Sequence, residues 1–403
     1  MKQLICAFGI AALVGGTAST LAGQGRGQDH APIQIPDSSV EQPGEHGVAA
    51  HTNHLIRVGP EAVGTAPRGE TPSSIASVYS LTNLQTAGAD VIVIVDAFHY
   101  ATALNDFNAF AGQFGLPQEL STDPLDTNNQ VFQVVYASGS KPRNNCGWAQ
   151  EAALDIEWAH AMAPNAKIVL VEAATNSFAN LFQAVDVASA IANAREVSMS
   201  WGGSEFSSEA GNDGHFTHAG IVYFAASGDT GGATIYPGVS PNVVSAGGTR
   251  INRSASGTFL SETGWSGSGG GPSKYESRPG YQDIIQTIVG GARGVPDYSF
   301  DADPNTGVSV YDTTSCKGIS GWLVFGGTSV ASPSLAGIVN SAGSNVSSAA
   351  ELSLLYQSVG NNGLMINSAN FRDILSGTAG SFSAKTGWDF VTGIGSTITL
   401  SGK

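Results

Sequence analysis

Five runs of strand length, separated by segments with helical patterns, constrain the fold of this chain more than any other feature. They lie at residues 90–98, 130–137, 166–173, 196–202 and 221–227. Most are nearly continuous in Val, Ile, Leu and Ala, as in "DVIVIVDAF", and this is typical of strands buried on both faces. Helical patterns fill the gaps, for example at 147–164. We therefore predict an α/β fold with a doubly wound, mainly parallel sheet and helices on both faces.

Composition excludes several classes of protein. Charged residues make up 12% of the chain, against roughly 25% in an average soluble domain, and the formal net charge is -15. A chain with so few basic residues has no electrostatic footprint for nucleic acid and no attraction to anionic membranes. We expect neither kind of partner.

The N-terminus has the pattern of an export signal. Lys2 precedes the apolar run "LICAFGIAALV", and small residues follow up to Ala22. We predict a signal peptide at 1–22 and a secreted protein, extracellular or periplasmic, with no membrane segment after signal removal. A buried N-terminal helix is the alternative.

Residues 23–70 are rich in Gly, Pro, Gln and His and have no sustained apolar periodicity. We interpret them as a flexible leader or vestigial pro-segment, with a solvated His cluster preferred over a metal site. The catalytic domain is expected at 71–403, and Thr71-Pro72 at its beginning is a typical start of a helix.

Removal of the signal peptide would leave Cys146 and Cys316, which suggest either one disulfide or two buried free thiols.

The stretch "GGTSVASPSLAGIV" presents Ser329 in a glycine turn directly before a helical run. The N–H groups of a helix N-terminus can hold an anion, so a nucleophilic serine would be well placed there. A serine hydroxyl also needs a base. Candidates for the surrounding site follow three predicted strands: Asp96, the segment Ser200–Gly202, and Asp229.

Histidine is the usual base, but the histidines beyond the leader do not suggest one. These are His99, His160, His215 and His218, and none begins a helix in a His-Gly-Thr context. Glu151 and Asp155 are four residues apart and share one face of a predicted apolar helix. Two carboxyl groups this close would share a proton, although a pair with this spacing is more often a solvated surface.

The series of motifs resembles the sedolisin family, the serine-carboxyl peptidases, over residues 71–399. It comprises, in this order, "GWAQEAALDIEWAHAMAPNAKIVLVEA", "VSMSWGG", "AASGDTGG", "GGGPSKYE", "PDYSFDADPNTG", "GGTSVASPSLAGI" and "GWDFVTGIGS". The resemblance implies a subtilisin-like fold. It also implies Ser329 as nucleophile, Glu151 as general base, Asp155 as the carboxylate supporting Glu151, and Asp229 as a protonated donor in the oxyanion hole. Ser200, Trp201 and Gly202 would pair with an extended peptide substrate.

The resemblance further implies one structural Ca²⁺. Its ligands would be the carboxylates of Asp373 and Asp389 and the carbonyls of Ile374, Lys385 and Gly387. In the implied fold, Cys146 and Cys316 approach the active-site region, and this favours a disulfide between them. Many relatives carry a large N-terminal prodomain, whereas only residues 23–70 separate the predicted signal from the catalytic domain in this chain.

The sequence thus predicts a monomeric, secreted serine endopeptidase that acts in acid on peptides and denatured proteins. Two other functions remain open. The chain could be an inactive peptide-binding protein of the same fold, or a conventional subtilisin-type protease that uses Asp96 and an unidentified histidine.

Overall fold

The computed structural model describes residues 32–59, 63–343 and 347–403, which belong to one compact unit, Ala31–Lys403. The predicted signal peptide at 1–22 and the first part of the leader lie outside the described residues. Within the described part of the chain, no helix combines the length and apolarity that a bilayer crossing requires.

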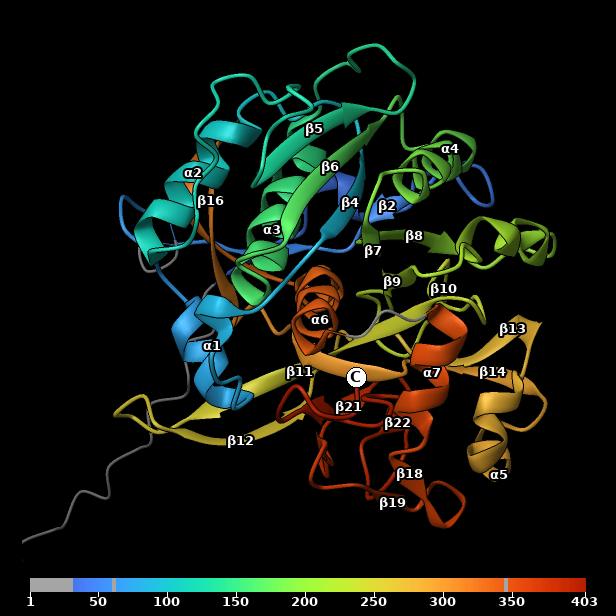
Figure 1. The fold of residues 1–403 in the computed structure, drawn as a ribbon. Helices are drawn as coiled ribbons and strands as arrows, with labels where there is room; N and C mark the ends of the chain where they lie inside the picture. The colour runs from blue at the N-terminus through green and yellow to red at the C-terminus, as the bar shows by residue number, and fades with distance from the viewer. Residues whose placement is uncertain (1–31, 60–62, 344–346) are drawn as a thin grey trace, which may run out of the picture. The chain divides into compact units, whose positions relative to one another are not determined.

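A large sheet with a mainly parallel core organises the unit (Figure 1). Its strand order is β20-β23-β15-β11-β9-β7-β4-β6-β5, and β12 pairs with β11. Every pairing from β23 to β5 is parallel. The strands span Val91–Ala97 (β4), Phe132–Tyr136 (β5), Lys167–Ala173 (β6), Ala194–Met199 (β7), Val222–Ala226 (β9), Val244–Arg253 (β11), Phe259–Gly264 (β12), Tyr298–Asp301 (β15), Phe371–Arg372 (β20) and Ser396–Thr397 (β23). Four of the five strand predictions and the α/β fold class are confirmed, whereas the run predicted at 196–202 divides at Ser200 into β7 of this sheet and β8 (Trp201–Ser204) of a smaller one.

Burial on both faces explains why the sequence of strand β4 is nearly continuous in apolar residues. Ile92 and Ile94 join one hydrophobic core, while Val93 and Val95 join the other. Helices α3 (Cys146–Met162) and α6 (Thr328–Ala342) cover the first face, and α4 (Phe178–Ser189) covers the second (Figure 1). Because the order of strands reverses around β4, the carboxyl ends of β4, β7 and β9 form the crevice where ligands bind in sheets of this kind.

The leader differs from the flexible segment that we expected. Residues 32–59 form β1 (Ile33–Gln34), β2 (His51–Thr52) and β3 (Leu55–Arg57). Strand β3 lies between β1 and β17 (Ile319–Gly326), which also pairs with β16 (Val308–Cys316), and β2 pairs with β8 (Trp201–Ser204). Strands as short as β2 and β3 are stable because β8 and β17 satisfy their backbone and Ala50 and Ile56 are fully buried. The division of the chain at residue 70 stays a prediction.

The remaining elements surround this frame. The helices are α1 (Pro72–Val78), α2 (Ala103–Phe114), α5 (Gln286–Val289) and α7 (Ser348–Tyr356), with 3-10 turns at Asp37–Ser39, Leu84–Thr86, Glu209–Phe216, Gly280–Ile285 and Asn361–Gly363. The minor strands are β10 (Ile235–Tyr236), β13 (Gly271–Ser277), β14 (Ala292–Val295), β18 (Val359–Gly360), β19 (Met365–Ile366), β21 (Thr378–Ala379) and β22 (Phe382–Ser383). The start of α1 is capped by Thr71, whose side chain accepts from the backbone N–H of Ser74, as the helix start signal predicted.

Candidate active site

Ser329 lies in the first turn of α6 and is fully buried. The preceding Gly327 has φ +101°, and a Cβ there would collide with the Asn53 carbonyl and with Oδ2 of Asp229, so the turn requires glycine. Pro333 removes the N–H that would otherwise bond the Ser329 carbonyl within the helix. The Ser329 hydroxyl donates to the Ser200 carbonyl at 3.2 Å, and its backbone N–H donates to the Asn53 carbonyl at 3.0 Å.

Glu151 projects from the second turn of α3 into the same place and has no solvent exposure. Its Oε2 accepts from the Asn53 backbone N–H at 3.1 Å and lies 2.8 Å from Nδ1 of His54. Oε1 has no hydrogen-bond partner among the described residues. The leader therefore holds one oxygen of this carboxylate and leaves the other available to a neighbouring hydroxyl.

Asp155 lies one turn further along α3, as the four-residue spacing predicted. Its Oδ1 accepts from the Ser200 hydroxyl at 2.9 Å. Burial, and then the charges of Asp96 and Glu151, raise the pKa of Asp155 well above its usual range. Asp96 is the penultimate residue of β4, and neither of its carboxyl oxygens has a partner among the described residues. Burial likewise raises the pKa of Asp96, and the charges of Glu151 and Glu172 add to the effect. The two aspartates thus favour holding protons near Glu151.

Asp229 follows β9 (Val222–Ala226) and contacts Thr328, the residue directly before Ser329. Its Oδ1 accepts from the backbone N–H and the hydroxyl of Thr328, at 2.7 and 2.8 Å. Its Oδ2 is buried, has no partner among the described residues, and lies against Gly327, next to the Asn53 carbonyl. Burial raises the pKa of Asp229 to about 8, although the two bonds from Thr328 act in the other direction. Below that pH the carboxyl is neutral, and a neutral carboxyl can donate to a carbonyl oxygen.

The segment Ser200–Gly202 forms an edge for an extended chain, and the leader occupies it. Strand β8 pairs with β2 in the register His51↔Gly202 and Thr52↔Trp201, and the Ser200 carbonyl accepts from the Asn53 N–H at 3.1 Å. The Trp201 side chain is fully buried and donates to the Val95 carbonyl at 2.8 Å. Only the backbone of Trp201 faces the leader, so its indole is part of the core.

The four histidines weighed from sequence have other partners. His99 bonds Glu172, the buried His160 bonds the Pro117 carbonyl, His215 bonds Asp186, and His218 contacts Tyr223. Burial lowers the pKa of His160 to about 4, consistent with a neutral structural role. Among the described contacts of the Ser329 hydroxyl there is no histidine.

Sequence reasoning missed Asn53 and His54. Both were assigned to a solvated leader, yet they are 1% and 0% exposed. The ring of His54 also stacks on Phe325, with 5.3 Å between centroids. A weak signal was present in "AAHTNHLIRV", where Ala50 and Ile56 mark apolar positions on either side of the buried pair.

The two carboxylates of the predicted calcium site lie in one C-terminal loop. Asp373 accepts from the Gly387 N–H at 3.0 Å, and Asp389 accepts from the Lys385 N–H at 2.9 Å. Burial raises the pKa of Asp373 and raises that of Asp389 to about 6. Among the described residues, the carbonyls of Ile374, Lys385 and Gly387 accept no hydrogen bond. Two carboxylates and free carbonyls are donors that suit a hard cation, so these residues fit calcium.

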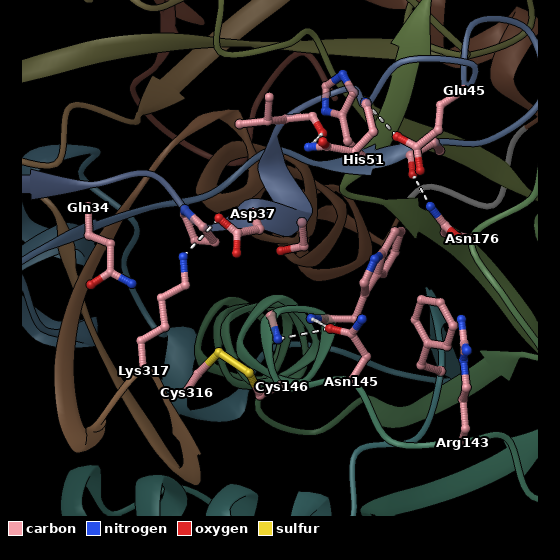
Figure 2. Close-up of a pocket in the computed structure, with 18 residues that line it drawn as sticks. Gln34, Asp37, Glu45, His51, Arg143, Asn145, Cys146, Asn176, Cys316 and Lys317 are labelled. Atoms are coloured by element: carbon pink, nitrogen blue, oxygen red, sulfur yellow. Dashed lines mark hydrogen bonds and ion pairs between the residues drawn. A yellow bond between two sulfur atoms is a disulfide. The ribbon is translucent and has the colours of Figure 1, made fainter.

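A disulfide joins Cys146 and Cys316, as the sequence suggested. It ties the first residue of α3 to the end of β16. Figure 2 shows it beside a cavity of about 490 Å³ that separates His51 and Glu45 of the leader from Asn145 and Arg143 of the body. The Asn145 side chain caps α3 by accepting from two backbone N–H groups. The helix that carries Glu151 is thus fixed at its start.

Comparison with known proteins gives a consistent family. No family model matches the chain. Sedolisin from Pseudomonas sp. (strain 101) is 26% identical over 419 residues, which cover 91% of this chain and 67% of that protein. Kumamolisin from Bacillus sp. (strain MN-32) is 30% identical over 378 residues, covering 83% of this chain and 63% of the relative. The chain thus spans about two thirds of the length of these curated relatives.

Solved structures agree on the fold. A structure of Pseudomonas sedolisin, described as a serine-carboxyl proteinase complexed with two molecules of pseudo-iodotyrostatin, superposes with a TM-score of 0.68 at 24% identity. The match covers 83% of this chain and 96% of that one. The curated relatives therefore agree with the family that the motifs resemble, and this structure agrees with the predicted fold.

Proposed function

The chain belongs to the sedolisin family, and we propose that it is a secreted, acid-acting serine-carboxyl endopeptidase in which Ser329 attacks and Glu151 transfers protons. One observation carries the proposal. The N–H of Ser329 donates to the Asn53 carbonyl at 3.0 Å, and that carbonyl oxygen and the buried Oδ2 of Asp229 both border the position that a Cβ of Gly327 would take, so the oxyanion of a peptide substrate would form there.

The reaction follows from these contacts. Ser329 Oγ turns from the Ser200 carbonyl toward the free Oε1 of Glu151, transfers its proton there, and attacks the peptide carbonyl carbon. The oxyanion is held by the Ser329 N–H and by the proton of Asp229. Glu151 then protonates the departing amine, and an acyl-enzyme on Ser329 remains. Water, deprotonated by Glu151, hydrolyses this ester and completes the cycle.

Acid action follows from opposite requirements on two carboxyl groups. Glu151 serves as base only when ionised, and Asp229 serves as donor only when protonated. Burial favours the neutral form of Asp229 up to about pH 8. Asp155 and Asp96 also favour their neutral forms, so they add little negative charge that would oppose ionisation of Glu151. In this arrangement Asp155 supports Glu151 through its charge state.

Substrates would be peptides and denatured proteins, because an extended chain is needed to pair with the Ser200–Gly202 edge.

One Ca²⁺ would be held by Asp373 and Asp389 together with the carbonyls of Ile374, Lys385 and Gly387. The ion would neutralise the half-buried carboxylate of Asp373 and the buried one of Asp389, and it would crosslink the C-terminal loop. We further propose that the protein acts as a monomer after export.

The test is hydrolysis of a denatured protein across the pH range by wild type and by Ser329→Ala. We expect a bell-shaped profile with its maximum in acid for wild type, and no hydrolysis by the variant. Labelling of wild type, but not of the variant, by a peptide aldehyde would confirm the nucleophile. Equal rates in both proteins would contradict the proposal, and a folded wild type without activity would favour the inactive peptide-binding alternative.

A further inference from the structure

The cavity seen in Figure 2 has two walls of opposite charge. On the side of the leader, the titratable residues that line it are Asp37, Glu45 and His51. On the side of the body, the charged residues that line it are Arg143 and Lys317, and no carboxylate is among the lining residues of that wall. This charge is opposite to that of the whole chain, which has 17 basic and 32 acidic residues. The wall of the body therefore favours a negatively charged group in the cavity.

Arg143 differs from Lys317 in having no carboxylate partner among the described residues. Lys317 Nζ donates to Oδ1 of Asp37 at 2.8 Å. The guanidinium of Arg143 instead lies over the face of the Phe98 ring, with 5.1 Å from the guanidinium carbon to the ring centroid. A guanidinium on an aromatic face keeps its N–H groups free to donate to a carboxylate. Arg143 is thus the cation of this wall that can accept an acidic ligand.

The backbone fixes Phe98 beside Arg143 in an uncommon conformation. Phe98 has φ +67°, which is rare for a bulky side chain, and its N–H donates to the Ala173 carbonyl at 2.9 Å. Its ring is 4% exposed and meets Trp148 edge-on, with 6.1 Å between centroids. The Arg143 carbonyl accepts from the His99 N–H at 2.9 Å. Strained residues of this kind gather at binding sites, so both halves of the stacked pair are held ready for a ligand.

The position of Ala50 indicates which side chain of a substrate would enter the cavity. The Asn53 carbonyl accepts from the Ser329 N–H at 3.0 Å, so residue 53 marks the residue whose carbonyl is attacked. Ala50 lies three residues earlier, is fully buried and lines the cavity. Asn176 holds its backbone in two bonds of 2.9 Å, one from the Ala50 N–H to the Asn176 carbonyl and one from Asn176 Nδ2 to the Ala50 carbonyl. A longer side chain on this backbone would extend into the cavity that the Ala50 methyl group only borders.

We propose that Arg143 is a specificity-determining residue, which selects peptides that carry glutamate as the fourth residue before the cut bond. This inference rests on the proposed function, because a substrate must pair with the Ser200–Gly202 edge for its chain to follow the path of residues 50–53. The carboxylate of that glutamate enters the cavity and accepts from the guanidinium of Arg143.

The pH dependence of the preference separates charge from shape. Glutamate and glutamine have nearly the same size, but only glutamate becomes anionic as the pH rises through its ordinary pKa of about 4.3. Arginine stays cationic throughout. We therefore expect glutamate to be preferred over glutamine by about threefold to fivefold at about pH 5.5, as for a partly exposed ion pair, and the preference to vanish at about pH 3.5.

The experiment uses a short synthetic peptide that wild type cuts at a single bond, with Ala, Gln, Glu or Lys as the fourth residue before that bond. At the higher pH, kcat/KM should be largest for Glu and smallest for Lys, and at the lower pH Glu and Gln should be equal. If Ser329→Ala cuts none of the peptides and wild type cuts Glu and Gln equally at both pH values, the inference is overturned and the proposed function stands. A preference for Glu that persists at the lower pH would also overturn the inference. If folded wild type cuts no peptide or denatured protein, both are overturned.

A matched pair of arginine variants tests the residue itself. Arg143→Gln keeps a polar side chain but removes the charge, so the ratio of kcat/KM for Glu over Gln should fall to about one at the higher pH. Arg195→Gln removes a cation at the start of β7, where it pairs with Asp90 at 2.9 Å, and should keep the ratio of wild type. Because each ratio compares two peptides on the same sample, partial loss of folded protein does not change it. Equal ratios in the two variants would overturn the assignment of Arg143.

Discussion

Two groups of buried carboxyl side chains flank helix α3, and only one of them lies at Ser329. The site group is Asp96, Glu151 and Asp155. The support group is Asp106, Glu157 and Asp312, with Glu157 also projecting from α3. All six residues are at most 1% exposed. Burial alone therefore does not distinguish a catalytic acid from a structural one.

Hydrogen bonding differs most between Asp106 and Asp96, although Glu157 Oε1 and Asp312 Oδ2 also lack a partner among the described residues and Asp155 accepts from Ser200. Asp106 accepts from the hydroxyls of Tyr100, Thr102 and Thr313 and from the Thr313 N–H, which fastens α2 to β16. Glu157 accepts from the Tyr311 N–H at 3.0 Å. In the site group, Asp96 has no described partner, and the bonds to Glu151 come from the leader. Carboxyl groups that the body of the protein leaves unsatisfied remain available for a substrate and for proton transfer.

The largest effect should come from exchanging one carboxyl for an amide in each group. Glu151→Gln removes the base, and we expect turnover to fall by about 10⁴–10⁶, as for a lost member of a catalytic triad. Glu157→Gln makes the same change six residues along the same helix and should stay within about threefold of wild type, as expected for a residue outside the reaction. Steady-state rates on a peptide substrate would measure both. Comparable losses in the two variants would mean that the groups do not differ in function.

Asp229 provides a further comparison with the support group, because it is a buried acid whose proton is needed to stabilise the oxyanion. Asp229→Ala should reduce turnover by about 10²–10³, the usual effect of losing one oxyanion donor. Asp229→Asn keeps a donor at the position of Oδ2 but cannot ionise. Since the carboxyl loses its proton at about pH 8, the asparagine variant should retain its rate further into the alkaline range than wild type. Coincident alkaline limbs would show that another group controls that limb.

The sequence was sufficient to predict the strands and the helix that carry the site, but not the leader segment that lies across it. The strand runs and the apolar helix that carries Glu151 could be predicted because buried side chains give a recognisable pattern of apolar residues. Ser329 stood out in its glycine turn before a helical run, but the roles of Asp155 and Asp229 could be assigned only through the family resemblance, since each alone fits an ordinary surface or turn. The position of the leader could not be read, because Asn53 is held through its backbone N–H and carbonyl, which every residue except proline has. Backbone pairing of this kind leaves almost no trace in sequence.

The support group should matter for stability where it does not matter for turnover. Asp106→Ala would leave the hydroxyls of Tyr100 and Thr313 and the Thr313 N–H without their acceptor. We expect the free energy of unfolding to fall by about 2–4 kcal/mol, as for several buried donors that lose their acceptor. Urea denaturation would measure this, and turnover per folded molecule should be unchanged. If the variant instead lost turnover while keeping its full stability, Asp106 would have a role in the reaction and would belong to the site group.

The smallest expected effect is the pH dependence of stability. The two groups are distinguished by measuring both the free energy of unfolding and the rate of turnover against pH. Burial raises the pKa of Asp312 to about 7, above its unfolded value near 3.9. The folded state therefore binds this proton more tightly, so the stability it contributes is complete below about pH 4 and is lost as the pH rises through 7. We expect the free energy of unfolding to decrease over that interval, and Asp312→Asn to remove that part of the slope. Asp155→Asn should flatten the same slope, because burial raises the pKa of Asp155 too, but it should also change the pH profile of turnover. If both variants flatten stability and neither alters the rate profile, Asp155 supports the fold rather than Glu151.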